Sequence, residues 1–452
     1  MTFEQAMALV EEEHRFPADL AHFHEKRARW LFETTGLAEA LADTPVVVVA
    51  GTCGKASTAT FLASILREWL DGRGRFQPIG LGVKPPREES PEGHRERYQM
   101  VGGGGEVVRI EPEAFASFVT EVAPYLDRKP EELGPWAPYD LRAWILGRYF
   151  VERGVPLAVV EANIGLLQDP ASLFPNLPLT VLSPIGTDHA SQFSLPATLP
   201  ACLEGLGERA GPVWHKAGGL AAGTVAVVGR QDPEVLAACL ELAAQRQVRR
   251  VWAWGRDYHV EQVEADLTGG RCVLTWEGCR LLLETPSVGG HQIENAAVAA
   301  MAAWALHVDG VLPGSEEDIL RACRAGVRRA QPPGRLRTVQ VEPLCLEASA
   351  LSFSKVRASV GDVASLVSGG GIVLCAAFLE RNKPYFRELA ESMLSCPAVR
   401  AVVVAGTLER PAGHPGSGAE LLQQVRALRP DLPAAYEEDP GTAMERARSM
   451  AG

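Results

Sequence analysis

The feature that most constrains the fold is a run of four valines, residues 46–49, followed at once by a glycine-containing turn. A strand with apolar side chains on both faces is typical of a parallel strand buried between two layers of helices. A Gly-Thr-Cys-Gly turn over residues 51–54 follows, and residues 59–70 then have the apolar spacing of a helix. The sequence therefore predicts a strand, a tight turn and a helix N-terminus in direct succession.

This succession is typical of a phosphate-binding loop, because backbone N–H groups and the positive end of the helix dipole face an anion there. Lys55 is placed to reach the β- and γ-phosphates of ATP, and Ser57 or Thr58 to hold Mg²⁺. The common P-loop pattern has a glycine five residues before Gly54, where this chain has Val49, so the loop is a variant. The alternative is a turn that only joins a strand to a helix. The residues expected to contact the nucleotide here are Gly51, Thr52, Gly54, Lys55, Ser57 and Thr58.

Composition narrows the class of protein. The 452 residues suggest two or three domains, and the 46% hydrophobic and 22% charged residues are typical of a globular chain. A net charge of −12 disfavours a nucleic-acid surface. Nine dispersed cysteines indicate reduced thiols. Because no signal-peptide pattern and no apolar run of about 18 residues is present, we expect a cytoplasmic protein that does not cross a membrane.

Two further apolar segments, residues 156–160 and 179–183, read as buried strands that end in polar residues. Glu161 follows the first strand, and Asp188 and His189 follow the second. The carboxyl ends of parallel strands face the crevice where α/β sheets bind ligands. Carboxylate and hydroxyl oxygens suit Mg²⁺, although histidine is an unusual ligand for so hard an ion. An ordinary turn is the alternative for Asp188 and His189.

Together these segments resemble the folylpolyglutamate synthase branch of the Mur ligase superfamily. The loop is similar to that family's Gly-Thr-Asn-Gly-Lys-Gly-Ser-Thr, with Cys53 and Ala56 as departures. The strand ends resemble the family's Glu-Val-Gly-Leu-Gly-Gly-Arg and Ile-Gly-x-Asp-His motifs, although residues 166–168 replace Gly-Gly-Arg. The resemblance implies that Glu161 and His189 ligate Mg²⁺.

A third motif, His215-Lys216-Ala217-Gly218, resembles the family's Glu-Lys-Ala-Gly. The resemblance implies that Lys216 is carbamylated by CO₂ and ligates a second Mg²⁺. Residues 208–211, Glu-Arg-Ala-Gly, are a rival match, and their arginine could not be carbamylated in this way. A solvated lysine without a role is the remaining alternative for Lys216.

Three later segments extend the resemblance. Residues 289–296 are similar to the family's Gly-x-His-Gln-x-x-Asn-Ala, which implies that Gln292 and Asn295 lie by the nucleotide. Arg335 falls in a Pro-Gly-Arg sequence like the family's hinge, and its guanidinium can clamp a phosphate. Glu347 stands where the family has the Asp of Asp-Gly-Ala-His-Asn-Pro, but the His and Asn of that segment are missing.

The order of the expected strands and helices predicts an α/β fold. We expect a doubly wound, P-loop-type central domain with a small β-rich extension, followed by a C-terminal Rossmann-like α/β domain. The expected boundaries are 1–331, a linker at 332–336, and 337–452. Residues 73–105, rich in glycine, proline and charge, are expected to form a long loop or lid. In it, Arg95 and Arg97 face either a substrate or solvent.

The resemblance implies an ATP-dependent ligase that joins a small carboxylic acid to the amine of an amino acid, with glutamate as the expected amine. The acid would become an acyl phosphate, which the amine attacks, and ADP and phosphate would be released. Two alternatives remain open: a ligase repurposed for a non-folate acid, and a nucleotide-binding pseudo-ligase that serves as a partner subunit. The expected catalytic residues are Lys55, His189, Lys216 and Arg335, and the expected Mg²⁺ ligands are Ser57, Glu161, His189 and Lys216.

Overall fold

The computed structural model forms two compact units. The residues that it describes are 1–11, 24–84, 91–134, 136–187, 190, 193–334, 336–340, 342, 344–347, 353–367, 371–378, 380–406 and 417–451. Unit 1 comprises Met1–Glu264, Arg271–Pro286 and Gln292–Pro333. Unit 2 comprises Ala265–Gly270, Ser287–His291 and Gly334–Gly452.

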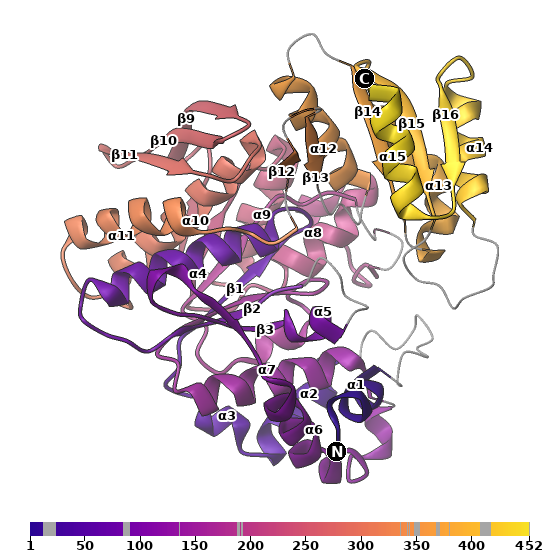
Figure 1. Cartoon of the computed structure of the whole chain (residues 1–452). Coiled ribbons are helices and arrows are strands. Elements are labelled where there is room, and N and C mark those ends of the chain that lie inside the picture. Colours follow the sequence, from indigo (N-terminus) through magenta and orange to yellow (C-terminus); the bar gives the residue numbers. More distant parts are fainter. Residues whose placement is uncertain are drawn as a thin grey trace. The chain divides into compact units, whose positions relative to one another are not determined.

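Unit 1 is built on a sheet of eight strands in the order β4-β3-β2-β5-β1-β6-β7-β8. Strands β1, β2 and β3 of this sheet are labelled in Figure 1. Strand β1 (Val46–Ala50) is parallel to both of its neighbours, β5 (Ala158–Glu161) and β6 (Leu179–Leu182). The carboxyl ends of these three strands therefore lie at one edge of the sheet. The remaining parallel pairings are those of β2 (Ile79–Gly82) with β5, of β7 (Val225–Val228) with β6, and of β8 (Arg250–Ala253) with β7. Strand β3 (Tyr98–Val101) pairs antiparallel with β2, and β4 (Val107–Arg109) pairs antiparallel with β3.

Helices cover both faces of this sheet, and each face has its own hydrophobic core. One core contains α4 (Lys55–Asp71), α10 (Gly290–Val308) and α11 (Glu316–Arg329). The other is built mainly on α1 (Phe3–Glu11), α2 (His24–Thr34), α3 (Leu37–Ala40), α6 (Pro112–Leu126), α7 (Pro138–Arg153), α8 (Ala210–Ala217) and α9 (Pro233–Gln245). Along β1, Val47 and Val49 belong to the first core, and Val46, Val48 and Ala50 to the second. This is the doubly wound arrangement that the four valines predicted.

The expected small β-rich extension is also present. It is a sheet of three strands that are neighbours both in the chain and in the sheet. They are β9 (Tyr258–Asp266), β10 (Gly269–Trp276) and β11 (Cys279–Thr285). Trp276 of β10 stacks edge-on against Trp304 of α10, with ring centroids 5.0 Å apart. This aromatic pair fastens the extension to the first core.

The expectation of a long loop over residues 73–105 was wrong. That segment contains β2, the helix α5 (Pro91–Arg95) and β3, although residues 85–90 lie outside the described part. A Cβ on Gly80 would lie 2.6 Å from Phe150 Cε1, and one on Gly82 would lie 2.4 Å from Leu146 Cδ2. These glycines are present because α7 packs directly on the strand, so a composition typical of loops concealed a buried strand.

Unit 2 contains a parallel sheet flanked by helices. Its strands, in the order β14 (Ile372–Ala376), β15 (Val399–Ala405) and β16 (Ala434–Glu437), are all parallel. A separate antiparallel pair is formed by β12 (Arg337–Gln340) and β13 (Cys345–Glu347). The helices of this unit are α12 (Phe353–Leu366), α13 (Phe386–Met393), α14 (Gly418–Leu428) and α15 (Pro440–Ala451). The predicted C-terminal Rossmann-like fold is thereby confirmed.

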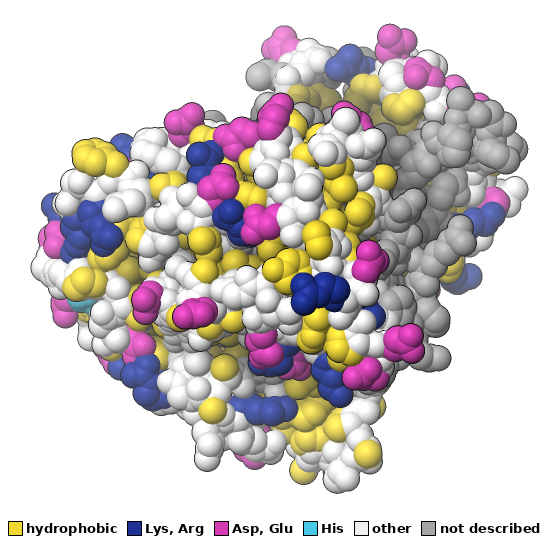
Figure 2. Space-filling view, turned by 90° about the horizontal axis from the view of Figure 1, so that it is seen from below, with side chains coloured by type: hydrophobic (Ala, Val, Ile, Leu, Met, Phe, Trp, Pro, Cys, Tyr) yellow, Lys and Arg dark blue, Asp and Glu magenta, His cyan; other side chains and the backbone are white. Residues whose placement is uncertain are grey.

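The surface and the cysteines fit the composition. All nine cysteines are free thiols. On the face shown in Figure 2, acidic and basic side chains of the described residues are interspersed. Among the helices that the structure describes, none is both long and apolar enough to span a membrane.

Candidate active site

The turn between β1 and α4 is a glycine cradle. Gly54, the residue before α4, has a φ of 81°, in the left-handed region that glycine adopts without strain. A Cβ on Gly54 would lie 2.3 Å from Asn295 Oδ1, and one on Gly51 would lie 2.1 Å from Ser183 Oγ. Both positions therefore require glycine because there is no room for a side chain.

The loop after β6 supports this cradle from behind. The N–H groups of Thr52 and Cys53 both donate to the carbonyl of Pro184, at 2.8 and 3.2 Å. The N–H of Gly186 donates in return to Thr52 Oγ1 at 3.0 Å. Gln231 fixes the same loop, because its amide group donates to Ser183 O and accepts from Ile185 N. The sequence analysis missed Gln231, for which no local motif gave a signal.

Lys55 and Glu161 lie together at the carboxyl ends of β1 and β5. Lys55 Nζ is 3.7 Å from Glu161 Oε1, and the two side chains are only 12% and 8% exposed. Glu161 Oε2 accepts a hydrogen bond of 2.7 Å from Lys84 N. One carboxylate oxygen of Glu161 is thus held by the backbone after β2 and the other faces a cation.

The two residues whose hydroxyls are expected to hold Mg²⁺ are Ser57 and Thr58. Both are fully buried at the start of α4. Thr58 Oγ1 donates to Asn295 Oδ1 at 3.5 Å. Asn295 and Gln292 lie in the first two turns of α10 and are 7% and 0% exposed. The structure thus places Asn295 against the loop, and the position of Gln292 and Asn295 beside a nucleotide stays a prediction.

The segment after Glu161 is held by Asp169, a buried residue that the sequence analysis missed. Its Oδ2 accepts from the N–H groups of Asn163 and Ile164 at 2.7 and 2.9 Å. Its Oδ1 accepts from Ala171 N at 3.0 Å. Burial raises the pKa of this carboxyl, and the donated hydrogen bonds oppose the shift. The signal was available, because an Asp before a Pro is typical of a helix N-cap, and the 3₁₀ turn Pro170–Leu173 begins there.

Lys216 is buried, so a solvated lysine does not describe it. The residue is 2% exposed, and its Nζ lies 4.3 Å from the centre of the Phe193 ring. The preceding residue, His215, accepts at its carbonyl from the N–H groups of Leu166 and Leu167 at 2.8 and 3.0 Å. The last turn of α8 is therefore joined to the segment that follows Glu161.

Arg209, the rival of Lys216, is a surface residue. Its guanidinium pairs with Asp232 at 2.8 Å and with Glu234 at 3.0 Å, and both carboxylates are at least 70% exposed. Such pairs contribute little to stability or chemistry. Of the two candidates, Lys216 is the one that points inward.

The remaining predicted residues are Asp188, His189, Arg335 and Glu347. Asp188, His189 and Arg335 lie outside the described residues. Glu347 is exposed at the end of β13, where its backbone stands opposite that of Arg337 in the antiparallel register of unit 2.

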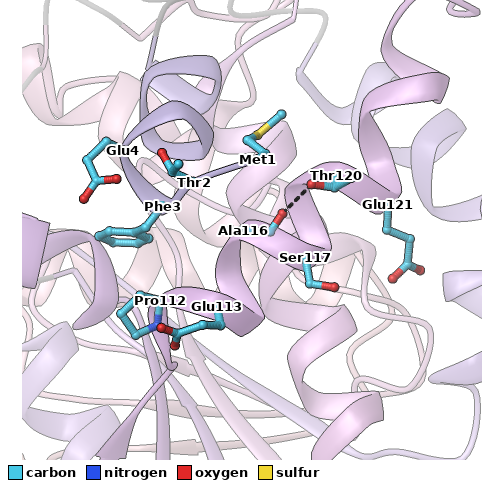
Figure 3. Close-up of a pocket in the computed structure, with 10 residues that line it drawn as sticks. All are labelled: Met1, Thr2, Phe3, Glu4, Pro112, Glu113, Ala116, Ser117, Thr120 and Glu121. Carbon is cyan, nitrogen blue, oxygen red and sulfur yellow. Dashed lines mark hydrogen bonds between the residues drawn. The ribbon is translucent and has the colours of Figure 1, made fainter.

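A cavity of about 850 Å³ lies elsewhere in unit 1, between the start of α1 and α6 (Figure 3). Its lining carries the carboxylates of Glu4, Glu113 and Glu121 and no lysine or arginine. Within it, Thr120 Oγ1 donates to the carbonyl of Ala116 at 2.8 Å. A wall with this charge disfavours a phosphate, so size alone does not make this cavity the nucleotide site.

The parallel sheet, the glycine cradle and the lysine at the start of α4 define an α/β protein of the P-loop type. The motifs predicted a likeness to folylpolyglutamate synthases of the Mur ligase superfamily, and comparison with known proteins confirms it. The chain is 28% identical over 298 residues to the dihydrofolate synthase/folylpolyglutamate synthase of Bacillus subtilis, which covers 65% of this chain and 62% of that relative.

A second relative is the probable bifunctional folylpolyglutamate synthase/dihydropteroate synthase of Halobacterium salinarum. It is 27% identical over 308 residues, which cover 66% of this chain and 32% of that protein. The chain thus matches less than two thirds of the length of either relative. No profile of a known protein family matches the chain.

Solved structures share the fold over nearly the whole chain. The folylpolyglutamate synthase of Mycobacterium tuberculosis, complexed with ADP, has a TM-score of 0.76 at 20% identity and covers 99% of this chain and 91% of its own. The folylpolyglutamate synthase of Thermotoga maritima has a TM-score of 0.72 at 18% identity, with coverage of 98% and 91%. At this identity the likeness establishes the fold and leaves the activity to be argued from the site.

Proposed function

We propose that the protein is an ATP-dependent ligase that joins a carboxylic acid to the amine of an amino acid, with glutamate as the first amine to test. The observation that carries the proposal is the glycine cradle with Lys55 at its exit and Glu161 3.7 Å away. A turn that has no room for a Cβ at Gly51 and Gly54 lets an anion approach its backbone, and a nearly buried lysine beside it adds a positive charge.

In this proposal the γ-phosphoryl group of ATP passes to the carboxylate of the acid, and ADP leaves. The amine then attacks the acyl carbon, a C–N bond forms, the C–O bond to phosphate breaks, and the amine loses a proton. Lys55 and Arg335 neutralise the charge on the phosphates, and Gln292 and Asn295 border the nucleotide. The reaction needs positioning and charge stabilisation, so no side chain has to act as a nucleophile.

The residues present fit a hard cation. Ser57 and Glu161 offer oxygen atoms, and a cation already faces Glu161 Oε1 in the form of Lys55 Nζ. Ser57, Glu161 and His189 would hold one Mg²⁺, which when bound offsets negative charge on the phosphates. Glu161 keeps its orientation through the N–H of Lys84, which leaves the other oxygen to face the ion.

Lys216 is proposed to carry a carbamate and to hold a second Mg²⁺. Its burial beside Phe193 supports a role inside the protein rather than on the surface. Intact-mass measurement in bicarbonate should find an adduct that is lost in Lys216→Arg, because a guanidinium does not form this carbamate. The absence of this adduct from the parent protein, or its persistence in Lys216→Arg, would remove the carbamate from the proposal. Arg209→Lys is the matched control and should leave the adduct unchanged.

The identity of the acid is open. Two of the relatives named above are named for folylpolyglutamate synthesis, and another solved complex of this fold contains folate. Here residues 166–168 and 347–352 depart from the family's motifs, which favours a non-folate acid as the second candidate. The deciding experiment is ADP release screened over folates and other acids, each with and without glutamate. Release that requires both an acid and an amine supports ligation, and nucleotide binding without such release supports a pseudo-ligase.

A further inference from the structure

The segment after β7 carries a side chain that supports the phosphate loop from two strands away. Gln231 follows β7 after Gly229 and Arg230, and β6 lies between β7 and β1 in the sheet. The reaction described above gives Gln231 no role. Its contacts nevertheless lead to the loop in two steps, all of them within unit 1.

The first step is a pair of hydrogen bonds that use both ends of the Gln231 amide. Gln231 Nε2 donates to Ser183 O at 3.0 Å, and Gln231 Oε1 accepts from Ile185 N at 2.9 Å. The ladder between β6 and β7 ends just before, where Gly229 N donates to Leu182 O at 2.8 Å. The side-chain amide therefore takes the place of a peptide group and continues the ladder past the end of the strands.

The second step starts at Pro184, which lies between the two residues that Gln231 holds. The Pro184 carbonyl accepts from the N–H groups of Thr52 and Cys53 at 2.8 and 3.2 Å. Proline has no N–H of its own, so the backbone at Pro184 cannot be held by a donated bond. The bonds of Gln231 to the residues on either side thus fix the direction of the carbonyl that carries the loop.

These contacts divide the loop into two parts. The N–H groups of Thr52 and Cys53 are turned toward Pro184, whereas those at the start of α4 precede the first bond of the helix, from Thr58 N to Gly54 O at 2.8 Å. The first N–H groups of a helix have no acceptor in the helix itself, and they are the ones that bind anions. Their direction depends on the peptide units before Gly54, which the Pro184 carbonyl holds.

We propose that Gln231 is a positioning residue for nucleotide binding, because it holds the Pro184 carbonyl and, through it, the N–H groups of the phosphate loop. Gln231 touches neither the nucleotide nor the reacting atoms. This inference rests on the proposed function and adds a residue that sets the affinity of the loop for a phosphate.

The main test is the affinity of the full chain for ADP, measured by calorimetry. Gln231→Met keeps the length of the side chain and removes both hydrogen bonds, so the Kd for ADP should rise about tenfold. Gln245→Met is the matched control, because the Gln245 amide donates to Glu241 on the exposed side of α9 and should leave the Kd unchanged. Equal Kd values for the parent protein and Gln231→Met would overturn the proposal.

A second measurement tells positioning from a general loss of structure. Amide hydrogen exchange, followed residue by residue without nucleotide, should become faster at Thr52 and Cys53 in Gln231→Met and stay the same at Val227 in β7. Unchanged exchange at Thr52 and Cys53 would contradict the proposal. Faster exchange throughout unit 1 would indicate a structural role and would contradict it as well.

Two further variants should follow the hydrogen bonds. Gln231→Asn keeps both polar groups on a shorter side chain and should recover part of the affinity for ADP. Gln231→Glu keeps the acceptor for Ile185 N but turns an oxygen toward Ser183 O, so it should bind ADP no better than Gln231→Met. In ADP-release assays the KM for ATP should rise more than the KM for the acid. An affinity of Gln231→Glu equal to that of the parent protein would overturn the role of the amide.

The outcomes also separate this inference from the proposed function. If the parent protein binds ADP and Gln231→Met binds it equally well, nucleotide binding stands and the positioning role alone falls. If the parent protein binds no ADP, the proposed function falls and the role of Gln231 in nucleotide binding falls with it.

Discussion

The two sides of Glu161 are built in different ways. On the nucleotide side, the site consists of backbone: Gly51 and Gly54 leave no space for a Cβ, and Pro184 fixes two N–H groups of the loop. On the side of β2, a small cavity is lined by side chains, among them Arg97, Arg142 and the apolar Leu146. Backbone geometry tolerates few residue types, whereas a wall of side chains can be rebuilt for another ligand. The loop motif after β1 is accordingly readable, whereas residues 166–168, after Glu161, depart from the family's motif.

The largest effect should come from a change of Lys55, because it is the side chain of the loop that is proposed to neutralise charge on the phosphates. Lys55→Ala should lower ATP turnover by about 10²–10³-fold, because a positioned charge near the phosphates is lost. Stability should change little, since the contacts of Lys55 are long: 3.5 Å to Thr52 O and 3.7 Å to Glu161. ADP-release rates and the thermal midpoint measure the two effects. Lys26→Ala, an exposed lysine of α2, is the control, and equal rates in both variants would remove the phosphate-loop assignment.

The second effect tests whether the cradle depends on its backbone. Gly54→Ala should weaken nucleotide binding about tenfold or more, because the new Cβ meets Asn295 at 2.3 Å and the φ of 81° is strained. The dissociation constant for ADP is the measurement. Gly74→Ala is the control. Gly74 has a similar φ of 65°, but a Cβ there would meet no atom within 4 Å, so this variant has the backbone strain without the close contact. A nucleotide affinity of Gly54→Ala equal to that of Gly74→Ala would show that space at the loop does not matter.

In the segment after Glu161, the residue to change is Asp169, which holds that segment in place. Asp169→Asn replaces one acceptor oxygen by an NH₂ group that faces donors, so stability should fall by about 1–3 kcal/mol. The KM for the acid should rise more than the KM for ATP, because Asp169 holds the segment after Glu161 and not the phosphate loop. Denaturant unfolding and the two KM values are the measurements. Asp127→Asn, at an exposed helix end, should change neither, and a larger rise for ATP would contradict the division into two sides.

The smallest effect is expected at Cys53, where the chain departs from the family's motif but the backbone hydrogen bond of the loop can stay the same. Cys53→Asn restores the family's residue, and the contact that fixes this position is the hydrogen bond of its N–H to Pro184 at 3.2 Å, which both residues can make. The KM for ATP should change by about twofold or less, as is typical of a substitution worth about 0.5 kcal/mol. Alkylation of Cys53 in the parent protein serves as the contrast, because it adds bulk at the loop. A tenfold change in KM for Cys53→Asn would give the side chain a role of its own.

The sequence predicted those elements that the spacing of apolar residues and short motifs indicate. The valine strand, the helix from Lys55, the strand before Glu161 and the motif at Asn295 all lie where the pattern placed them. It did not predict β2, because Gly80 and Gly82 serve packing against α7 and look like loop residues in isolation. Nor did it predict Asp169 and Arg142, whose importance comes from partners that are distant along the chain or are backbone atoms. The roles of His189, Lys216 and Arg335 stay predictions.

The alternation along β1 has a consequence for how unit 1 unfolds. Val47 and Val49 serve one hydrophobic core, and Val48 serves the other, so a single strand is the shared wall of two compartments. Neither helical layer can detach without exposing one apolar face of β1 to water. The two compartments should therefore melt in one cooperative transition. The N–H groups of Thr52 and Cys53, which donate to the Pro184 carbonyl, should exchange more slowly than N–H groups of the same loop that face an anion.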